Sequence, residues 1–229
     1  MKKYLSLATP ALMGLVFFAV TARLTAAAYP QISWLQDAYW LVHLILPLVL
    51  MGGALALHLT ARGRTPMYLV SYALNAIGSG CVVGAIYGLR NYIPSVHLLA
   101  ALAPAFLIAA AAFLIPMLSK DLAKGITALV LAGLAFLLAV AGIVVWSLYS
   151  MPMGCCFLFS GLFILPFPIV IGTLKEAWAQ RFRYLSFSGF GTFFLVILVA
   201  AFILSEGDIL DGLDGFDFSD IGSGKKKGK

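Results

Sequence analysis

The segment PMYLVSYALNAIGSGCVVGAIYGL, residues 66–89, contains no charged side chain. A transmembrane helix needs about 20 mostly apolar residues to cross roughly 30 Å of hydrocarbon, and this segment is long enough to do so. Backbone polar groups must be satisfied within lipid, and the segment lacks the alternating pattern of a barrel strand. It is therefore predicted to be a membrane-spanning helix.

Six further segments of the same kind accompany it. The seven predicted spans are Leu5–Ala28, Ala38–Ala61, Pro66–Leu89, Pro94–Leu118, Leu122–Tyr149, Phe157–Leu174 and Leu185–Leu204. Hydrophobic residues make up 62% of the 229 residues and charged residues only 10%, against about 25% charged in an average soluble domain. We therefore expect an all-α, polytopic membrane bundle of seven transmembrane helices, and neither a soluble enzyme nor a nucleic-acid-binding module.

The basic residues predict an orientation in the membrane. Nine of them flank the same ends of the spans: Lys2, Lys3, Arg62, Arg64, Lys120, Lys124, Lys175, Arg181 and Arg183. The alternate short loops contain only Arg90. The positive-inside rule then predicts a multi-pass protein of the plasma (inner) membrane, with a cytoplasmic N-terminus and an extracytoplasmic C-terminus. The first span could also be read as a cleaved signal peptide, but its apolar stretch is longer than usual.

The two halves of the chain show a repeated pattern. At one constant offset, Leu12–Phe17 aligns with Leu131–Phe136, Pro47 with Pro166, and Arg62 with Arg181. This pattern predicts a duplication of residues 5–89 as residues 122–204, joined by the span 94–118; shared membrane composition is the alternative. The plan is similar to that of SWEET-type sugar transporters, although their Pro-Gln dipeptide is absent from the predicted spans. Paired helix breaks at Pro47 and Pro166 would point to a central substrate site.

A polar stripe runs along the segment 66–89. Ser71, Tyr72, Asn75 and Ser79 lie on one face at helical spacing, and polar residues inside a membrane are candidates for function because they are costly there. With Pro47 and Pro166, these residues form the predicted substrate pathway. The alternative is that the stripe only packs helices together, since small and polar residues are favoured at such interfaces.

A second candidate site lies near the outer boundary. His43 and His97 lie near the starts of spans on that side. A predicted outer loop adds the soft ligands Met151, Met153, Cys155 and Cys156. Such ligands suit copper, and two histidines on separate helices can hold haem iron. The ordinary interpretation is that these residues are interfacial and packing side chains. We expect no cofactor, with haem or copper as the alternative.

Three functions remain open at this point. No predicted span contains a carboxylate, and no protease, P-loop or metal motif is present, so an enzyme is disfavoured. The first hypothesis is a transporter or permease-like protein for a small uncharged solute. The others are a membrane redox subunit with haem or copper at the outer face, and a non-catalytic partner subunit that docks a protein through its outer face or tail. Residues 205–229, with acids at every third position from Asp208 and a Lys-rich end, are expected to be a disordered tail.

The charge distribution makes a topology prediction. A reporter fused at residue 229 should read extracytoplasmic, and one inserted in the loop at residues 62–65 should read cytoplasmic. The reason is that nine basic residues lie on one predicted side of the bilayer and only one lies in the short loops of the other side. Phosphatase and fluorescent-protein fusions measure this directly. A cytoplasmic C-terminus would reverse the predicted orientation.

Overall fold

The computed structural model describes residues 2–31, 45–89, 91–118, 124–167 and 177–204. All secondary structure within these ranges is helical, with no strand. The helices are α1 (Lys2–Ala28), a short 3-10 helix η1 (Tyr29–Gln31), α3 (Leu46–Thr60), α4 (Thr65–Leu89), α5 (Val96–Leu118), α6 (Lys124–Leu148), α7 (Met151–Ile164) and α9 (Trp178–Leu204). The prediction of an all-α bundle with seven helices is confirmed. The tail at residues 205–229 and His43 lie outside the described residues.

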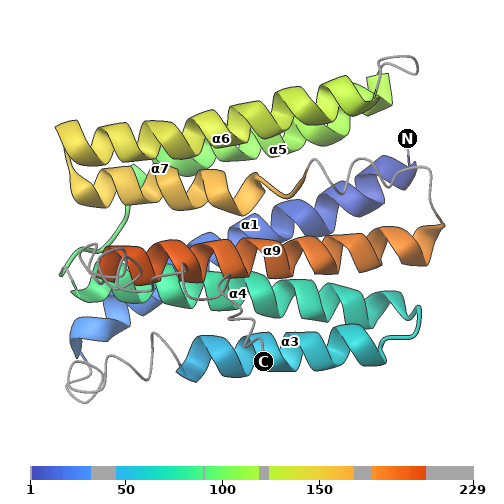
Figure 1. Ribbon diagram of the computed structural model, residues 1–229, viewed down its shortest axis with the longest axis horizontal. Helices are drawn as coiled ribbons and strands as arrows, with labels where there is room; N and C mark the ends of the chain where they lie inside the picture. The colour runs from blue at the N-terminus through green and yellow to red at the C-terminus, as the bar shows by residue number, and fades with distance from the viewer. Residues whose placement is uncertain (1, 32–44, 90, 119–123, 168–176, 205–229) are drawn as a thin grey trace, which may run out of the picture.

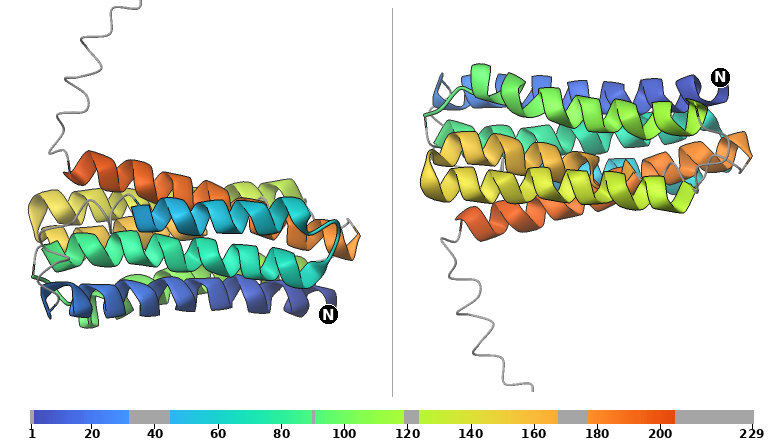
Figure 2. Two further views of the ribbon diagram at one scale, coloured as in Figure 1. Left: turned by 90° about the horizontal axis from the view of Figure 1, so that it is seen from below. Right: turned by 90° about the horizontal axis from the view of Figure 1, so that it is seen from above.

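The seven helices run side by side along the long axis of an elongated bundle (Figure 1), and they keep this alignment in the perpendicular views (Figure 2). Helix α4 packs against α1, α3 and α9, while α7 packs against α6, α5 and, less extensively, α9. Helix α1 also contacts α5, and so it connects the helices around α4 with those around α7. Within this junction, the ring of Phe18 on α1 stacks on that of Phe163 on α7, with centroids 4.8 Å apart.

Four helices are long and apolar enough to cross a membrane: Ser6–Gln31, Thr65–Leu89, Ala128–Leu148 and Ala179–Ile203. The other three helices have shorter apolar stretches over the residues whose side chains are described: Leu46–Thr60, Val96–Ala112 and Met151–Ile164. Large apolar side chains also cover the outside of the bundle; Leu99, Leu107, Leu129 and Leu148 are 66% to 78% exposed. An apolar exterior of this kind suits lipid and not water.

Glycines bring α1 and α4 into backbone contact. Gly80, Gly84 and Gly88 follow one another at every fourth residue of α4, so they share one face of the helix. A methyl group on Gly80 would lie 2.5 Å from the carbonyl oxygen of Phe18, and one on Gly84 would collide with the carbonyl oxygen of Ala22. Only glycine permits this approach, which resembles the small-residue packing typical of membrane helices.

Helices α6 and α7 approach each other by the same means. A methyl group on Gly161 would lie 2.6 Å from the backbone nitrogen of Ala139, and one on Gly154 would meet the carbonyl oxygen of Gly142. The start of α7 differs from the sequence-based expectation. The helix begins at Met151 and not near Phe157, because Pro152 is tolerated in a first turn and Gly154 packs closely on α6. Likewise α9 begins at Trp178, before the expected Leu185.

The helix pairing is not the same in the two halves of the chain. In the first half, α4 packs against both α1 and α3; in the second, α7, the counterpart of α3, packs against both α6 and α9. The aligned arginines also differ, since Arg62 lies in a turn with φ +42° whereas Arg181 is buried within α9. The duplication therefore stays a prediction from the sequence, and the packing of the helices adds no support to it.

The α1–α4 contact leads to a stability prediction. Replacing Gly80 with Ala should lower the free energy of unfolding by about 1–3 kcal/mol, since the new methyl group forces two backbones apart. Gly133→Ala on α6 is the matched control, because no atom lies within 4 Å of its added methyl group; it should leave stability unchanged or raise it by up to about 1 kcal/mol. Denaturant titration in detergent micelles measures both. Equal effects would show that the contact is not tight.

Candidate functional site

The polar stripe predicted on α4 is buried at the centre of one half of the bundle. Ser71, Asn75 and Ser79 are fully buried, and Tyr72 is 3% exposed. Helix α4 is 25 residues long, and at about 100° per residue Ser71 and Asn75 lie on the opposite face from the glycines that contact α1. The Ser71–Asn75 face is therefore turned toward α3 and α9, which is why these polar groups meet protein and not lipid.

Three side chains from three helices form a hydrogen-bonded polar chain, defined here as His58 of α3, Ser186 of α9 and Ser71 of α4. The hydroxyl of Ser71 donates to the carbonyl oxygen of Ala54 at 2.8 Å, and the hydroxyl of Ser186 donates to Ser71 Oγ at 2.8 Å. His58 Nδ1 lies 2.9 Å from Ser186 Oγ. Because both serine protons are already committed, Nδ1 must carry the proton in this last bond.

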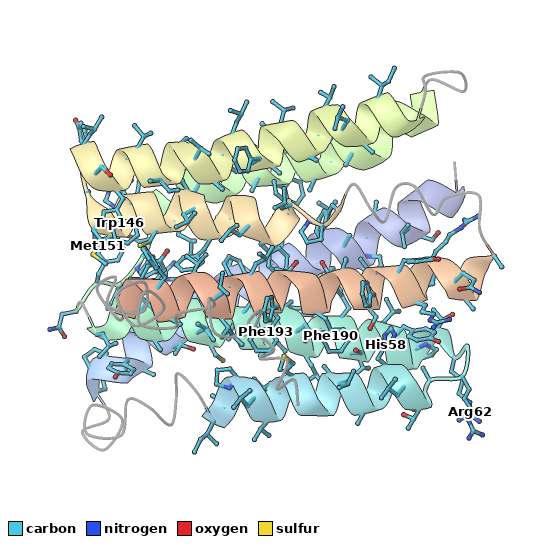
Figure 3. All side chains as sticks on the ribbon, in the orientation of Figure 1. His58, Arg62, Trp146, Met151, Phe190 and Phe193 are labelled. Carbon is cyan, nitrogen blue, oxygen red and sulfur yellow. The ribbon has the colours of Figure 1, made fainter. Side chains whose placement is uncertain are left out.

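His58 is held in place by aromatic rings as well as by Ser186. Its imidazole lies edge-on to Tyr68, with centroids 5.4 Å apart, and to Phe190, with centroids 5.7 Å apart. Figure 3 shows His58 near the end of α3, with Phe190 and Phe193 placed progressively farther along α9. The ring is thus fixed in orientation, and in its neutral form Nε2 is left as an acceptor.

Asn75 lies one turn deeper than Ser71 on the same face and differs from its neighbours in its hydrogen bonding. Its side chain is fully buried, and neither Oδ1 nor Nδ2 forms a hydrogen bond with the described residues. Gly189 on α9 makes room for it, since a methyl group there would be 3.4 Å from Nδ2. A buried polar group without a partner costs about 1–3 kcal/mol, so this amide calls for a functional explanation.

The other predicted pathway residues have structural partners. The hydroxyl of Tyr72 donates to the carbonyl oxygen of Ala11 at 3.2 Å, and that of Ser79 donates to the carbonyl oxygen of Asn75 at 2.8 Å. Pro47 is buried in the first turn of the described part of α3. Pro166 is buried beyond the end of α7. Residues 32–44 before Pro47 and 168–176 after Pro166 lie outside the described ranges, so matching helix breaks at the two prolines stay a prediction.

A cavity of about 380 Å³ lies at the end of the bundle where α3 ends and α4 and α9 begin, here called the basic end. Its lining residues are His58, Leu59, Arg62, Gly63, Tyr68, Ala179, Gln180 and Arg183. His58 belongs both to the cavity wall and to the polar chain. The polar chain therefore connects this cavity to the buried face of α4.

The opposite end of the bundle contains the residues of the predicted metal site. Tyr92 hydrogen-bonds with His97, and the hydroxyl of Tyr87 donates to Cys156 Sγ at 3.2 Å. The Tyr87 and Tyr92 rings lie edge-on, with centroids 5.7 Å apart. Burial, and to a lesser degree Cys156, raises the pKa of Tyr92 to about 12. His97 and Cys156 are thus linked through two tyrosines and not directly.

The predicted outer loop with four soft ligands was wrong. Met151, Met153, Cys155 and Cys156 lie on the first turns of α7, where both cysteines are buried; Figure 3 places Met151 beside Trp146. Within the described ranges, no three residues among His, Cys, Asp and Glu are grouped as metal ligands. Because His43 lies outside these ranges, haem or copper binding stays a prediction, and so does docking of a protein partner at this face or through the tail.

Sequence reasoning identified Asn75 and Ser71 but missed the residues that join them to the basic end. Ser186 is separated from Ser71 by 115 residues and from His58 by 128 residues, so no local sequence pattern indicates these bonds. The available signal was His58, the histidine nearest the basic residues of the neighbouring loop. Comparison with known proteins adds no relative, because no family model, curated protein or solved structure matches the chain.

The polar chain predicts unequal roles for two serines of α9. Ser186→Ala removes the bridge between α3 and α4 and leaves His58 Nδ1 without its partner, so it should lower the unfolding free energy by about 1–3 kcal/mol. Ser188→Ala is the matched control, since its hydroxyl bonds only within its own helix, to Leu185 at 2.7 Å, and it should cost well under 1 kcal/mol. Thermal unfolding in detergent compares them; equal losses would count against the bridge.

Proposed function

We propose that this chain is an integral membrane permease for a small uncharged polar solute. Its pathway would begin at the cavity of the basic end, follow the polar chain and reach Asn75. The observation that carries the proposal is the amide of Asn75, which is fully buried and has no partner among the described residues although it lies one turn from a hydrogen-bonded chain that opens on a cavity.

The chemistry of these groups favours an uncharged solute. Hydroxyl and amide groups can replace the hydrogen bonds that such a solute loses when it leaves water. The described residues include no Asp or Glu, so no carboxylate among them compensates the charge of a cation at depth. Arginines at the entrance would also repel cations.

The far side of Asn75 is closed in this conformation. Phe193 is fully buried, and its ring lies against Gly78, where an added methyl group would be 2.6 Å from it. Gly78 follows Asn75 by one turn on the same face of α4. In the proposed mechanism, Phe193 blocks passage toward the opposite end, and transport requires α9 to move relative to α4, as in carriers that open alternately to the two sides.

Solute flux through proteoliposomes tests the proposal. Stopped-flow light scattering should show faster swelling with inward gradients of glycerol or urea than in empty liposomes. Asn75→Leu should reduce this rate at least about tenfold, because it removes the amide that pairs with the solute. The same change should leave the unfolding free energy unchanged or raise it, since an unpaired buried polar group is lost.

Two controls keep this result interpretable. Ser79→Ala removes a hydroxyl on the same face that bonds only to the backbone of Asn75, and it should leave the flux within about twofold. Asn75→Cys should react with a small water-soluble thiol reagent faster than the native cysteines of the parent protein do. A stability loss at Asn75→Leu with unchanged flux, or a cysteine as unreactive as the native ones, would show that the amide only packs helices together.

A further inference from the structure

Two neighbouring hollows lie between α3 and α9 at the basic end. The first is the cavity of about 380 Å³ described above, and the second is a groove of about 610 Å³. They share His58, Leu59, Gln180 and Arg183 in their walls. Beyond these shared residues, the groove is lined by Leu55, Tyr184, Phe187 and Phe190. A polar, basic hollow thus continues into an apolar one.

The first hollow offers a positively charged binding surface. Arg62, from the turn between α3 and α4, and Arg183, from the first turns of α9, are both exposed and line it together. No acidic residue lies in the described ranges to neutralise them. A guanidinium group can bind two phosphate oxygens at once. Tyr68 accepts a hydrogen bond from the backbone N–H of Gly63 at 3.4 Å, which leaves its own hydroxyl proton able to donate.

The backbone at Arg62 is strained. Its φ of +42° is in the left-handed region, and Gly63 follows with φ +87°. For a residue with a side chain this region is unfavourable, although the residue that follows a helix C-cap, as Arg62 does, often adopts it. Replacing Arg62 with Gly therefore removes the guanidinium and the strain together.

The second hollow suits an acyl chain. Leu55 is 46% and Phe187 62% exposed on the outside of the helices, where an apolar bundle of this kind faces lipid. One end of the groove is apolar and the other adjoins the two arginines. This combination matches the charged head group and the acyl chain of a phospholipid. A free anion would need the two arginines but not the apolar groove.

We infer that the two hollows together bind one anionic phospholipid, with its phosphate on Arg62 and Arg183 and an acyl chain in the groove lined by Leu55, Phe187 and Phe190. The predicted orientation places this end in the cytoplasmic leaflet, where anionic lipids are enriched and where basic pockets between helices bind their head groups. The lipid site goes beyond the proposed transport and does not depend on it.

Native mass spectrometry of the full chain in detergent micelles tests the site. Phosphatidylglycerol and phosphatidylcholine with identical acyl chains are titrated separately. We expect one phosphatidylglycerol per chain, bound at least about fivefold more tightly than phosphatidylcholine. Arg62→Gly and Arg183→Gln should each weaken phosphatidylglycerol binding about fivefold, the loss expected for one arginine beside an anionic lipid. Arg62→Gly also relieves the backbone strain, so its loss of binding should come without a loss of thermal stability.

The turn provides a matched control for charge. Arg64 lies two residues after Arg62 and is equally an exposed arginine, but it lines neither hollow. Arg64→Gln should change lipid binding by less than about twofold. Equal binding of the two lipids, or an equal effect of Arg64→Gln and Arg62→Gly, would overturn the site in favour of general surface charge.

A further comparison separates the lipid from a free phosphate. Phe187→Ala should weaken phosphatidylglycerol binding about threefold or more, since an exposed groove residue contacts the acyl chain, while millimolar inorganic phosphate should not displace the lipid. Displacement by phosphate, with no effect of Phe187→Ala, would overturn the lipid in favour of a soluble anion. Asn75→Leu should leave lipid binding unchanged, so failure of the transport proposal would be seen separately from failure of this one.

Discussion

Helices α1 and α4 approach so closely that only glycine fits between their backbones at two positions of α4. Gly80 and Gly84 let the two backbones meet, and this contact determines which face of α4 turns away from α1. The opposite face, with Ser71 and Asn75, is then directed at α3 and α9. In a bilayer the lipid tails are as apolar as the helix surfaces, so no hydrophobic force drives helices together. Close backbone contacts of this kind therefore decide which helices pair.

Burial of polar groups follows from this arrangement. The polar chain can exist because α3, α4 and α9 each contribute one side chain to the same place, and each hydroxyl finds an acceptor. Asn75 has no such partner. The amide of Asn75 lies one turn from these three satisfied groups. The proposed solute would form hydrogen bonds with this amide without displacing a structural bond.

The basic end combines two kinds of surface. His58 takes part in the polar chain and in the walls of both hollows, so the proposed pathway and the proposed lipid site meet at one side chain. A phosphate held by Arg62 and Arg183 would lie in the cavity at which the proposed pathway begins. Lipid binding and solute entry would therefore use the same space.

The amino-acid sequence was enough to indicate an apolar environment for this protein and to predict the seven α-helices that the described residues form. Apolar segments such as residues 66–89 must become helices in lipid, because the backbone has no other partner there. It also identified Asn75 and Ser71, since a polar residue within an apolar segment is visible without a structure. The start of α7 was misjudged because Pro152 and Gly154 suggest a loop in isolation, whereas packing on α6 makes them helical. Helix packing alone brings Ser186 to His58 and Ser71, and Arg62 to Arg183. These residues are far apart along the chain. They meet because particular helix faces can approach each other, and that property belongs to pairs of helices and not to any single segment.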